Sequence, residues 1–167
     1  MKLMTVNGNR SRPLFAGCLV LPLAVWAFDC YFLYNAQNLY DNLQKPVFAP
    51  PYPILIPAAA ALSLLMGYAS YRVAVHKPGR RGVRVCLVLY AAHLVTSFAW
   101  PVIFFGFENP GLALYVLFAL LILLVACVYS FVRVDAAAAY LLLPAFAFWC
   151  YVTAVNYGIV LFQRMQA

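Results

Sequence analysis

The chain has 167 residues, of which 67% are hydrophobic and 9% are charged, and its mean hydropathy is +0.90. A typical soluble domain is about 45–50% apolar and about 25% charged, and a short chain cannot hide this much apolar surface in one soluble core. The composition therefore excludes a soluble enzyme, a disordered chain and a disulfide-stapled secreted domain. It leaves an integral membrane protein, and since a spanning helix needs roughly 20 apolar residues, the length holds about five spans.

The charge balance also fits a membrane protein. Eleven Lys and Arg stand against four Asp and Glu, for a formal net charge of +7. The basic residues lie mostly between apolar runs, as the positive-inside rule requires, and no basic face is interleaved with stacking aromatic residues. We therefore expect the lipid bilayer as a partner and no nucleic acid. The five cysteines, an odd number without a C-x-x-C pair, are interpreted as buried small hydrophobic residues.

Five apolar runs predict an all-α, five-transmembrane-helix bundle in a single integral membrane domain, residues 1–167. A polar, basic start precedes the first span at 13–34, which is too long for the apolar part of a signal peptide, so we expect it to be retained. Residues 35–53 form a proline-rich loop between helices 1 and 2, and the proline density there disfavours helix. The other spans are predicted at 53–71, 83–105, 111–131 and 136–162, with Pro57 expected to kink or break the second.

The distribution of basic residues predicts the orientation in the membrane. Five spans place the N-terminus, the second loop and the fourth loop on one side. That side holds nine of the eleven basic residues, and the other holds Lys45 and Arg164: the nine are Lys2, Arg10, Arg12, Arg72, Lys77, Arg80, Arg81, Arg84 and Arg133. The positive-inside rule then predicts the N-terminus inside and the C-terminus outside.

Catalytic and metal-binding motifs are absent from the sequence. No H-E-x-x-H, G-x-S-x-G or phosphate-binding glycine loop is present, and His76 and His93 are too far apart to form a helical metal pair. We therefore expect no catalytic residue, no metal site and no required cofactor. Asp29 is the only acid well within a span. An acid there is functional by default, but Asp29 is also close enough to the span's end to reach the outer interface, so both interpretations stay open.

The aromatic content is high, with 13 Phe, 12 Tyr and 3 Trp making up 17% of the chain. Aromatic walls with a few polar points suit a large, flat, apolar ligand. Interfacial belts and lipid-facing packing also use aromatic residues, and on composition alone they are the better explanation.

Several short motifs favour a ligand pocket over interfacial belts and lipid-facing packing as the role of the aromatic residues. The sequence Y-D-N-L-Q-K-P at 40–46 is followed by Pro50-Pro51, by M-G-Y-A-S-Y at 66–71, by A-W-P-x-I-F-F-G at 99–106, and by A-V-N-Y at 154–157. In this order and spacing, from about residue 35 to about residue 160, the chain resembles the translocator protein family. Its members are also called tryptophan-rich sensory proteins or peripheral benzodiazepine receptors.

The resemblance implies a five-helix bundle that forms a homodimer, in a bacterial membrane or the mitochondrial outer membrane. It also implies a hydrophobic small-molecule ligand: a tetrapyrrole such as porphyrin or haem, a sterol-like lipid such as cholesterol, or a benzodiazepine-site drug. We expect a binding protein or receptor, with the first loop as a lid stiffened by its prolines. A transporter, a porphyrin-modifying enzyme and a helical scaffold with a decayed pocket are the alternatives. Small residues at Ala91, Ala92, Thr96 and Ala99 suit a close helix contact, within the bundle or in a dimer.

Carrying the family's pocket over to matching positions predicts fourteen ligand-binding residues. They are Tyr40, Pro46, Ala59, Ser63, His93, Ser97, Trp100, Leu112, Tyr115, Phe148, Tyr151, Val152, Val155 and Asn156. Some have simpler interpretations. Trp100 is also typical of an interface anchor, and Asn156 of a bond to a neighbouring helix. His93 stands where relatives usually have Gln, and it is either a haem-iron ligand or, as we favour, a hydrogen-bonded packing residue.

The chain departs from the family at several tryptophan positions. Other residues replace these tryptophans: Leu39, Phe48, Ala59, Phe98, Leu112 and Phe148. Trp149 is one place beyond Phe148, which is about 100° around a helix. The loss of indoles weakens the expectation of light-driven porphyrin chemistry, and Ala59 enlarges the cavity. We predict a retained fold with an altered ligand preference, so that protoporphyrin quenches the tryptophan fluorescence less than in a tryptophan-rich relative.

Overall fold

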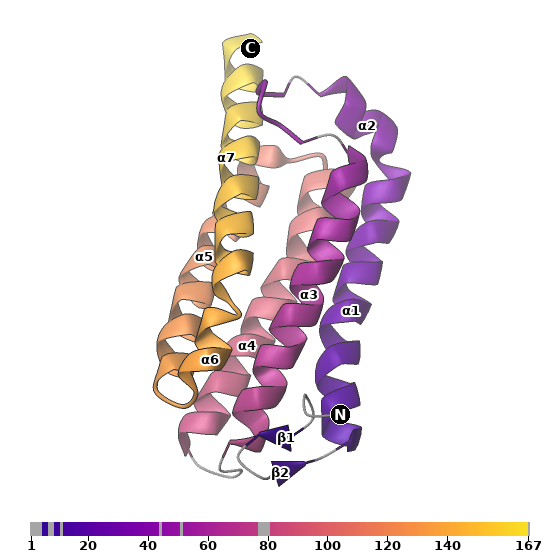
Figure 1. The fold of residues 1–167 in the computed structure, drawn as a ribbon. Helices are drawn as coiled ribbons and strands as arrows, with labels where there is room; N and C mark the ends of the chain where they lie inside the picture. The colour runs from indigo at the N-terminus through magenta and orange to yellow at the C-terminus, as the bar shows by residue number, and fades with distance from the viewer. Residues whose placement is uncertain are drawn as a thin grey trace.

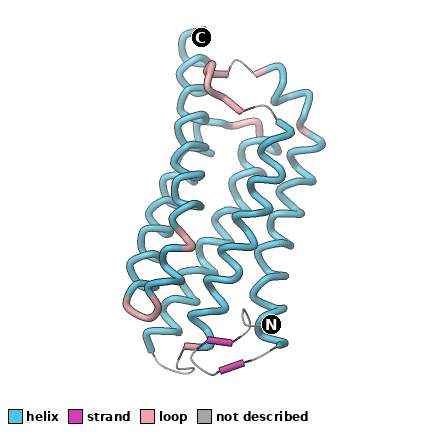
Figure 2. The backbone as a smooth tube through the Cα atoms, in the orientation of Figure 1, coloured by secondary structure: helices cyan, strands magenta, loops and turns pink. Residues whose placement is uncertain are grey.

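A computed structural model describes residues 5–6, 9–10, 12–43, 45–50, 52–76 and 81–166. Within these ranges two short strands pair antiparallel and helices make up nearly everything else (Figures 1 and 2). The elements are β1 (Thr5–Val6), β2 (Asn9–Arg10), α1 (Arg12–Asn35), α2 (Gln37–Asn42), α3 (Tyr52–Val75), α4 (Arg81–Pro101), the π-helical turn η2 (Val102–Gly106), α5 (Pro110–Val132), α6 (Ala136–Tyr140) and α7 (Leu143–Gln166).

The helices form an up-and-down bundle that confirms the all-α, five-span prediction. Five segments are long and apolar enough to cross a membrane, at 12–32, 54–75, 81–106, 110–132 and 136–165. Figure 1 shows the N-terminus and the α5–α6 turn at one end of the bundle, and the C-terminus with the first loop at the other. We call these the N-terminal end and the C-terminal end.

Two local predictions are corrected. Residues 37–42 of the expected extended loop are the short helix α2, because the prolines of this connector begin only at Pro46 and leave the preceding turns free to be helical. Pro57 was predicted to kink or break the second span, and it does not break it, because α3 continues through Pro57. Pro57 lies near the start of α3, where its missing N–H removes one hydrogen bond of the first turns.

The N-terminal half of the bundle is packed tightly. Leu124, Cys127 and Phe131 of α5 are fully buried against residues of α4 and α6. On the other side α1 and α3 approach closely at Gly67, where an added Cβ would lie 2.6 Å from the backbone oxygen of Cys18. Small residues permit such close helix contacts in a membrane, where dispersion rather than water exclusion holds helices together.

An ion pair joins α3 to the start of α6 at the same end. The Arg72 guanidinium donates to both carboxylate oxygens of Asp135, from Nε at 2.9 Å and from Nη2 at 3.3 Å. The Asp135 side chain also accepts from the backbone N–H of Ala137 at 3.0 Å, which caps α6. The two helices are therefore tied together through one carboxylate.

The helix order separates the basic residues as expected. Arg72, Arg81, Arg84 and Arg133 lie at or near helix ends on the N-terminal side, and Lys45 and Arg164 lie toward the other end. Lys2, Lys77 and Arg80 fall outside the described residues. Which end faces inside stays a prediction, and so does the homodimer.

Candidate functional site

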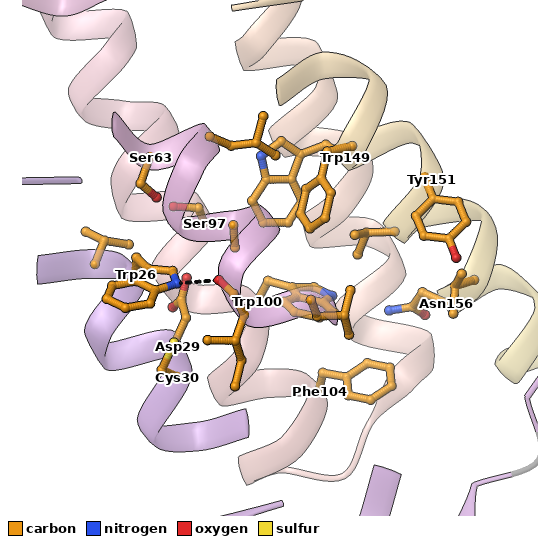
Figure 3. A pocket seen from close by; sticks show the side chains of 18 of the residues that line it. Trp26, Asp29, Cys30, Ser63, Ser97, Trp100, Phe104, Trp149, Tyr151 and Asn156 are labelled. Atoms are coloured by element: carbon orange, nitrogen blue, oxygen red, sulfur yellow. Dashed lines mark hydrogen bonds between the residues drawn. The ribbon is translucent and has the colours of Figure 1, made fainter. Parts of the chain in front are cut away.

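A cavity of about 110 Å³ lies between the helices, in the half of the bundle beneath the first loop. Its walls come from α1, α3, α4, η2 and α7, and Tyr40 of α2 and Pro50 of the loop border it as well (Figure 3). A water molecule needs roughly 10–15 Å³ measured in this way. The space therefore holds several waters or a small apolar molecule without any movement of the walls.

The structure brings eleven of the fourteen sequence-predicted residues to this cavity. They are Tyr40, Ala59, Ser63, His93, Ser97, Trp100, Phe148, Tyr151, Val152, Val155 and Asn156. The structure shows that these eleven residues line the same cavity. Their role in ligand binding stays a prediction.

The other three lie elsewhere, and their expected place in the pocket is corrected. Leu112 and Tyr115 are 49% and 73% exposed on the outer face of α5. The face of α5 that turns inward carries Ala113 and Leu117 instead, and α5 contributes no residue to the cavity lining. Pro46 is buried, but it packs against Gly158 of α7 and holds the loop there.

Sequence reasoning missed the wall that α1 supplies. It comprises five residues at helical spacing, Pro22, Val25, Trp26, Asp29 and Cys30. The motifs that we matched began near residue 35, so no pocket position could be carried over to the first span. The sequence did contain one indication of this wall, which is the acidic residue Asp29 within an apolar span. Trp26 is three residues before Asp29 and so lies on the same helix face.

All three tryptophans of the chain line this cavity. The ring centroids of Trp100 and Trp149 are 6.2 Å apart with an interplanar angle of 81°, and Phe104 lies 5.5 Å from Trp100. Phe148 and its neighbour Trp149 both reach the wall, although they are about 100° apart around the helix. The indole at Trp149 therefore faces the cavity even though Phe148 occupies the family's tryptophan position.

Unpartnered polar atoms gather on the same walls. Among the described residues, no hydrogen-bond partner is present for Asp29 Oδ1, Trp100 Nε1, both ring nitrogens of His93, and the amide oxygen and nitrogen of Asn156. His93 and Asn156 are each only 1% exposed. We expected hydrogen-bonded packing at His93, and none is present among the described residues. Buried groups of this kind are rare without a functional reason.

The first loop covers the cavity through a few specific contacts. The Tyr151 hydroxyl of α7 donates to the Phe48 carbonyl at 2.6 Å, and the Tyr40 hydroxyl donates to the Pro50 carbonyl at 3.0 Å. Lys45 donates to the Tyr40 carbonyl at 2.6 Å. Burial, and then the nearby Tyr151 and Asp41, raise the pKa of the Tyr40 phenol. This phenol therefore stays a hydrogen-bond donor at neutral pH.

Fold and site together define a class of protein: an integral membrane helical bundle that encloses an aromatic-walled cavity beneath a loop. The chain belongs to the TspO/MBR family, whose sequence model matches residues 15–161. The match includes α1, which the short motifs did not reach.

Three relatives illustrate the breadth of this similarity. The chain is 37% identical to the translocator protein of Homo sapiens over 119 residues, which is 71% of this chain and 70% of that protein. It is 31% identical over 150 residues to the tryptophan-rich protein TspO of Chlorobaculum tepidum, covering 89% and 93% of the two chains. It is also 31% identical over 125 residues to the tryptophan-rich sensory protein of Cereibacter sphaeroides, covering 75% and 77%.

Proposed function

We propose that this protein is a membrane receptor or binding protein that holds a hydrophobic small molecule in the cavity between its helices. The observation that carries the proposal is the convergence of Trp26, Trp100 and Trp149 on one enclosed space that also contains unpartnered polar atoms. Flat aromatic walls favour a flat or ring-containing apolar ligand, and a few polar points fix its orientation.

The ligand classes proposed are a tetrapyrrole such as porphyrin or haem, a sterol-like lipid, and synthetic drugs of the benzodiazepine site. For haem, His93 is the residue that would hold the iron, because both ring nitrogens lack a partner among the described residues and imidazole is a common axial ligand. Porphyrins and sterols instead need only the aromatic walls and a polar contact such as the Asn156 amide.

The experiment is a titration of the purified protein in phosphatidylcholine nanodiscs with protoporphyrin IX, cholesterol and a benzodiazepine-site drug. Because all three tryptophans line the cavity, a bound porphyrin lies near every indole and quenching of the intrinsic fluorescence reports its binding. Thermal stabilisation reports the non-absorbing ligands. The reduced number of indoles relative to tryptophan-rich relatives predicts weaker quenching per bound porphyrin. Neither quenching nor stabilisation by any of the three would identify a scaffold with a decayed pocket.

Two further measurements separate the receptor from its alternatives. Ligand flux across proteoliposomes would identify a transporter, and a new product mass after incubation with porphyrin would identify an enzyme. Tight binding with neither result supports a receptor.

The proposal includes an orientation with the N-terminus inside and the C-terminus outside, supported by the basic residues of the N-terminal end. The loop-covered end of the cavity then faces outward. A reporter fused to the C-terminus that proved cytoplasmic would contradict this orientation. Homodimerisation is part of the same proposal, and cross-linking in native membranes tests it.

A further inference from the structure

Asp29 is the only acidic residue among the described residues that line the cavity, and no Lys or Arg lies among them. It comes from α1, one turn beyond Trp26, and Figure 3 shows both side chains directed into the space between the helices. Its Oδ1 is buried and has no hydrogen-bond partner. Of the two interpretations left open for Asp29, its place on the cavity wall supports a functional one.

The donor nearest Asp29 along α1 and two cations of the chain are bonded elsewhere, whereas Trp100 Nε1 and the Asn156 amide nitrogen are donors of the same lining that form no hydrogen bond with Asp29. The Trp26 indole N–H, the donor nearest along the helix, donates to the Ile56 carbonyl at 3.1 Å (Figure 3). Lys45 bonds the Tyr40 carbonyl, and Arg72 is paired with Asp135 at the N-terminal end. A carboxylate in an apolar space is costly unless a charge or donor pairs with it. The chain itself supplies no such partner among the described residues.

Resting on the proposed function, we infer that the cavity selects flat hydrophobic ligands that carry a protonated amine, with Asp29 as the counter-ion of that amine. An ammonium beside Asp29 forms a charge-assisted hydrogen bond with the carboxylate. The indole face of Trp26 is near enough along the helix to add a cation–π contact. The ring body of such a ligand lies against Trp100 and Phe104, away from the charged end.

The same arrangement disfavours anionic ligands. A carboxylate-bearing molecule placed in this space would meet Asp29 with no Lys or Arg of the lining to offset the repulsion. The order of affinity for ligands of one shape is therefore amine first, neutral alcohol second and carboxylate last.

Three anthracenes of matched shape test this order: 9-(aminomethyl)anthracene, 9-anthracenemethanol and 9-anthracenecarboxylate. Their absorption overlaps tryptophan emission, so energy transfer from the three cavity tryptophans reports binding in phosphatidylcholine nanodiscs, with empty discs correcting for partitioning. The amine should bind at least about tenfold more tightly than the alcohol. In Asp29→Asn the affinity for the amine should fall to that for the alcohol.

A matched control removes a different acid. Glu108 is exposed in the turn between η2 and α5, so Glu108→Gln changes the net charge equally and should keep the preference for the amine. Thermal unfolding verifies that each variant is folded, and Asp29→Ser replaces Asp29→Asn if the amide is not tolerated.

The outcomes are distinguishable. Equal binding of amine and alcohol by the wild type overturns the inference and leaves the proposed function standing. A preference that survives in Asp29→Asn, or that is lost in Glu108→Gln, also overturns the inference. If the folded wild type binds none of the three probes but binds a ligand of the first titration, the inference alone fails; if it binds neither set, the proposed function fails with it.

Discussion

The two halves of the bundle are built from the same long helices but differ in how many of their buried polar groups have hydrogen-bond partners. The N-terminal half has the Tyr90 hydroxyl without a partner among the described residues, but its other polar groups named here are bonded. In the N-terminal half, Arg72 is paired with Asp135, the Ser70 hydroxyl donates to the Gly67 carbonyl at 2.8 Å, and the Ser130 hydroxyl donates to the Cys127 carbonyl at 3.0 Å. In the half beneath the first loop, His93 and Asn156 are equally buried and have no partner among the described residues.

We interpret this difference as a division of roles, in which the N-terminal half stabilises the bundle and the half beneath the first loop serves recognition. Satisfied polar groups in a tight core hold helices in place, whereas unsatisfied ones lower stability by about 1–3 kcal/mol each. Such a cost persists where a function needs the groups, and contact with a ligand is the function that we propose for them. Four substitutions, in order of decreasing expected effect, test whether the two halves divide in this way.

The largest effect is expected from filling the cavity. Val155 lines it and is 7% exposed, so Val155→Trp places an indole in the ligand's space. Ligand affinity should fall at least about a hundredfold, which is about 2.7 kcal/mol. The matched control is Val95→Trp on the outer face of α4, where Val95 is 70% exposed. Fluorescence titration with protoporphyrin IX measures both, and equal losses would show that the cavity is not the binding site.

The next effect concerns the tight half at the contact of α1 with α3. Gly67→Ala brings a Cβ to within 2.6 Å of the Cys18 backbone oxygen, so the two helices must separate. We expect a loss of about 2 kcal/mol in the free energy of unfolding. Gly17→Ala on α1 meets no atom within 4 Å and should be neutral or slightly stabilising. Denaturation in mixed micelles compares the two variants, and a similar stability for both would contradict the close packing.

Removing the cation of the ion pair should have a slightly smaller effect. Arg72→Gln leaves Asp135 without its partner and should destabilise the protein by about 1–2 kcal/mol. This is less than the roughly 3–5 kcal/mol of a fully buried pair, because the Arg72 side chain is 24% exposed and solvent screens part of the interaction. Arg84→Gln removes an exposed arginine near the same end as a control. High salt should reduce the difference in the free energy of unfolding between Arg72→Gln and Arg84→Gln. If this difference in stability does not depend on salt, Arg72→Gln destabilises the protein through lost packing contacts and not through the lost ion pair.

The smallest effect is expected at the loop. Tyr151→Phe removes the hydroxyl that donates to the Phe48 carbonyl and should cost about 1 kcal/mol of loop closure. Ligand should dissociate several-fold faster while the global unfolding transition moves little. Tyr115→Phe, on the outer face of α5, removes a phenol hydroxyl away from the loop and should leave dissociation unchanged. Stopped-flow displacement measures these rates, and unchanged dissociation in Tyr151→Phe would show that this bond does not restrain the lid.

Features that depend on the composition of one segment, such as the number of spans, were predicted correctly from the sequence. Features that depend on which face a helix turns toward the cavity were not. Span number follows from hydrocarbon-length apolar runs, which any five-span arrangement requires. Leu112 and Tyr115 were assigned to the pocket from their positions in the family, yet α5 turns Ala113 and Leu117 inward. Hydrophobic periodicity could not correct this, because a lipid-facing side chain is as apolar as a buried one.

Other misses have related causes. The proline density of residues 35–53 predicted an extended loop, but the prolines begin only at Pro46. The residues before them form the helix α2. The α1 wall, with Trp26 and Asp29, lay before the matched motifs.

By itself, the sequence predicted five spans long and apolar enough to cross a membrane, a place with the translocator-like proteins and fourteen pocket residues, eleven of which the structure brings to one cavity. Only the tertiary structure decided that α1 completes the wall, that α5 stays out of it, and that Asp29 and His93 face the cavity without a partner among the described residues. The physical reason is that hydropathy records how much of a helix is apolar, while the rotation of each helix depends on close contacts such as Gly67 against Cys18.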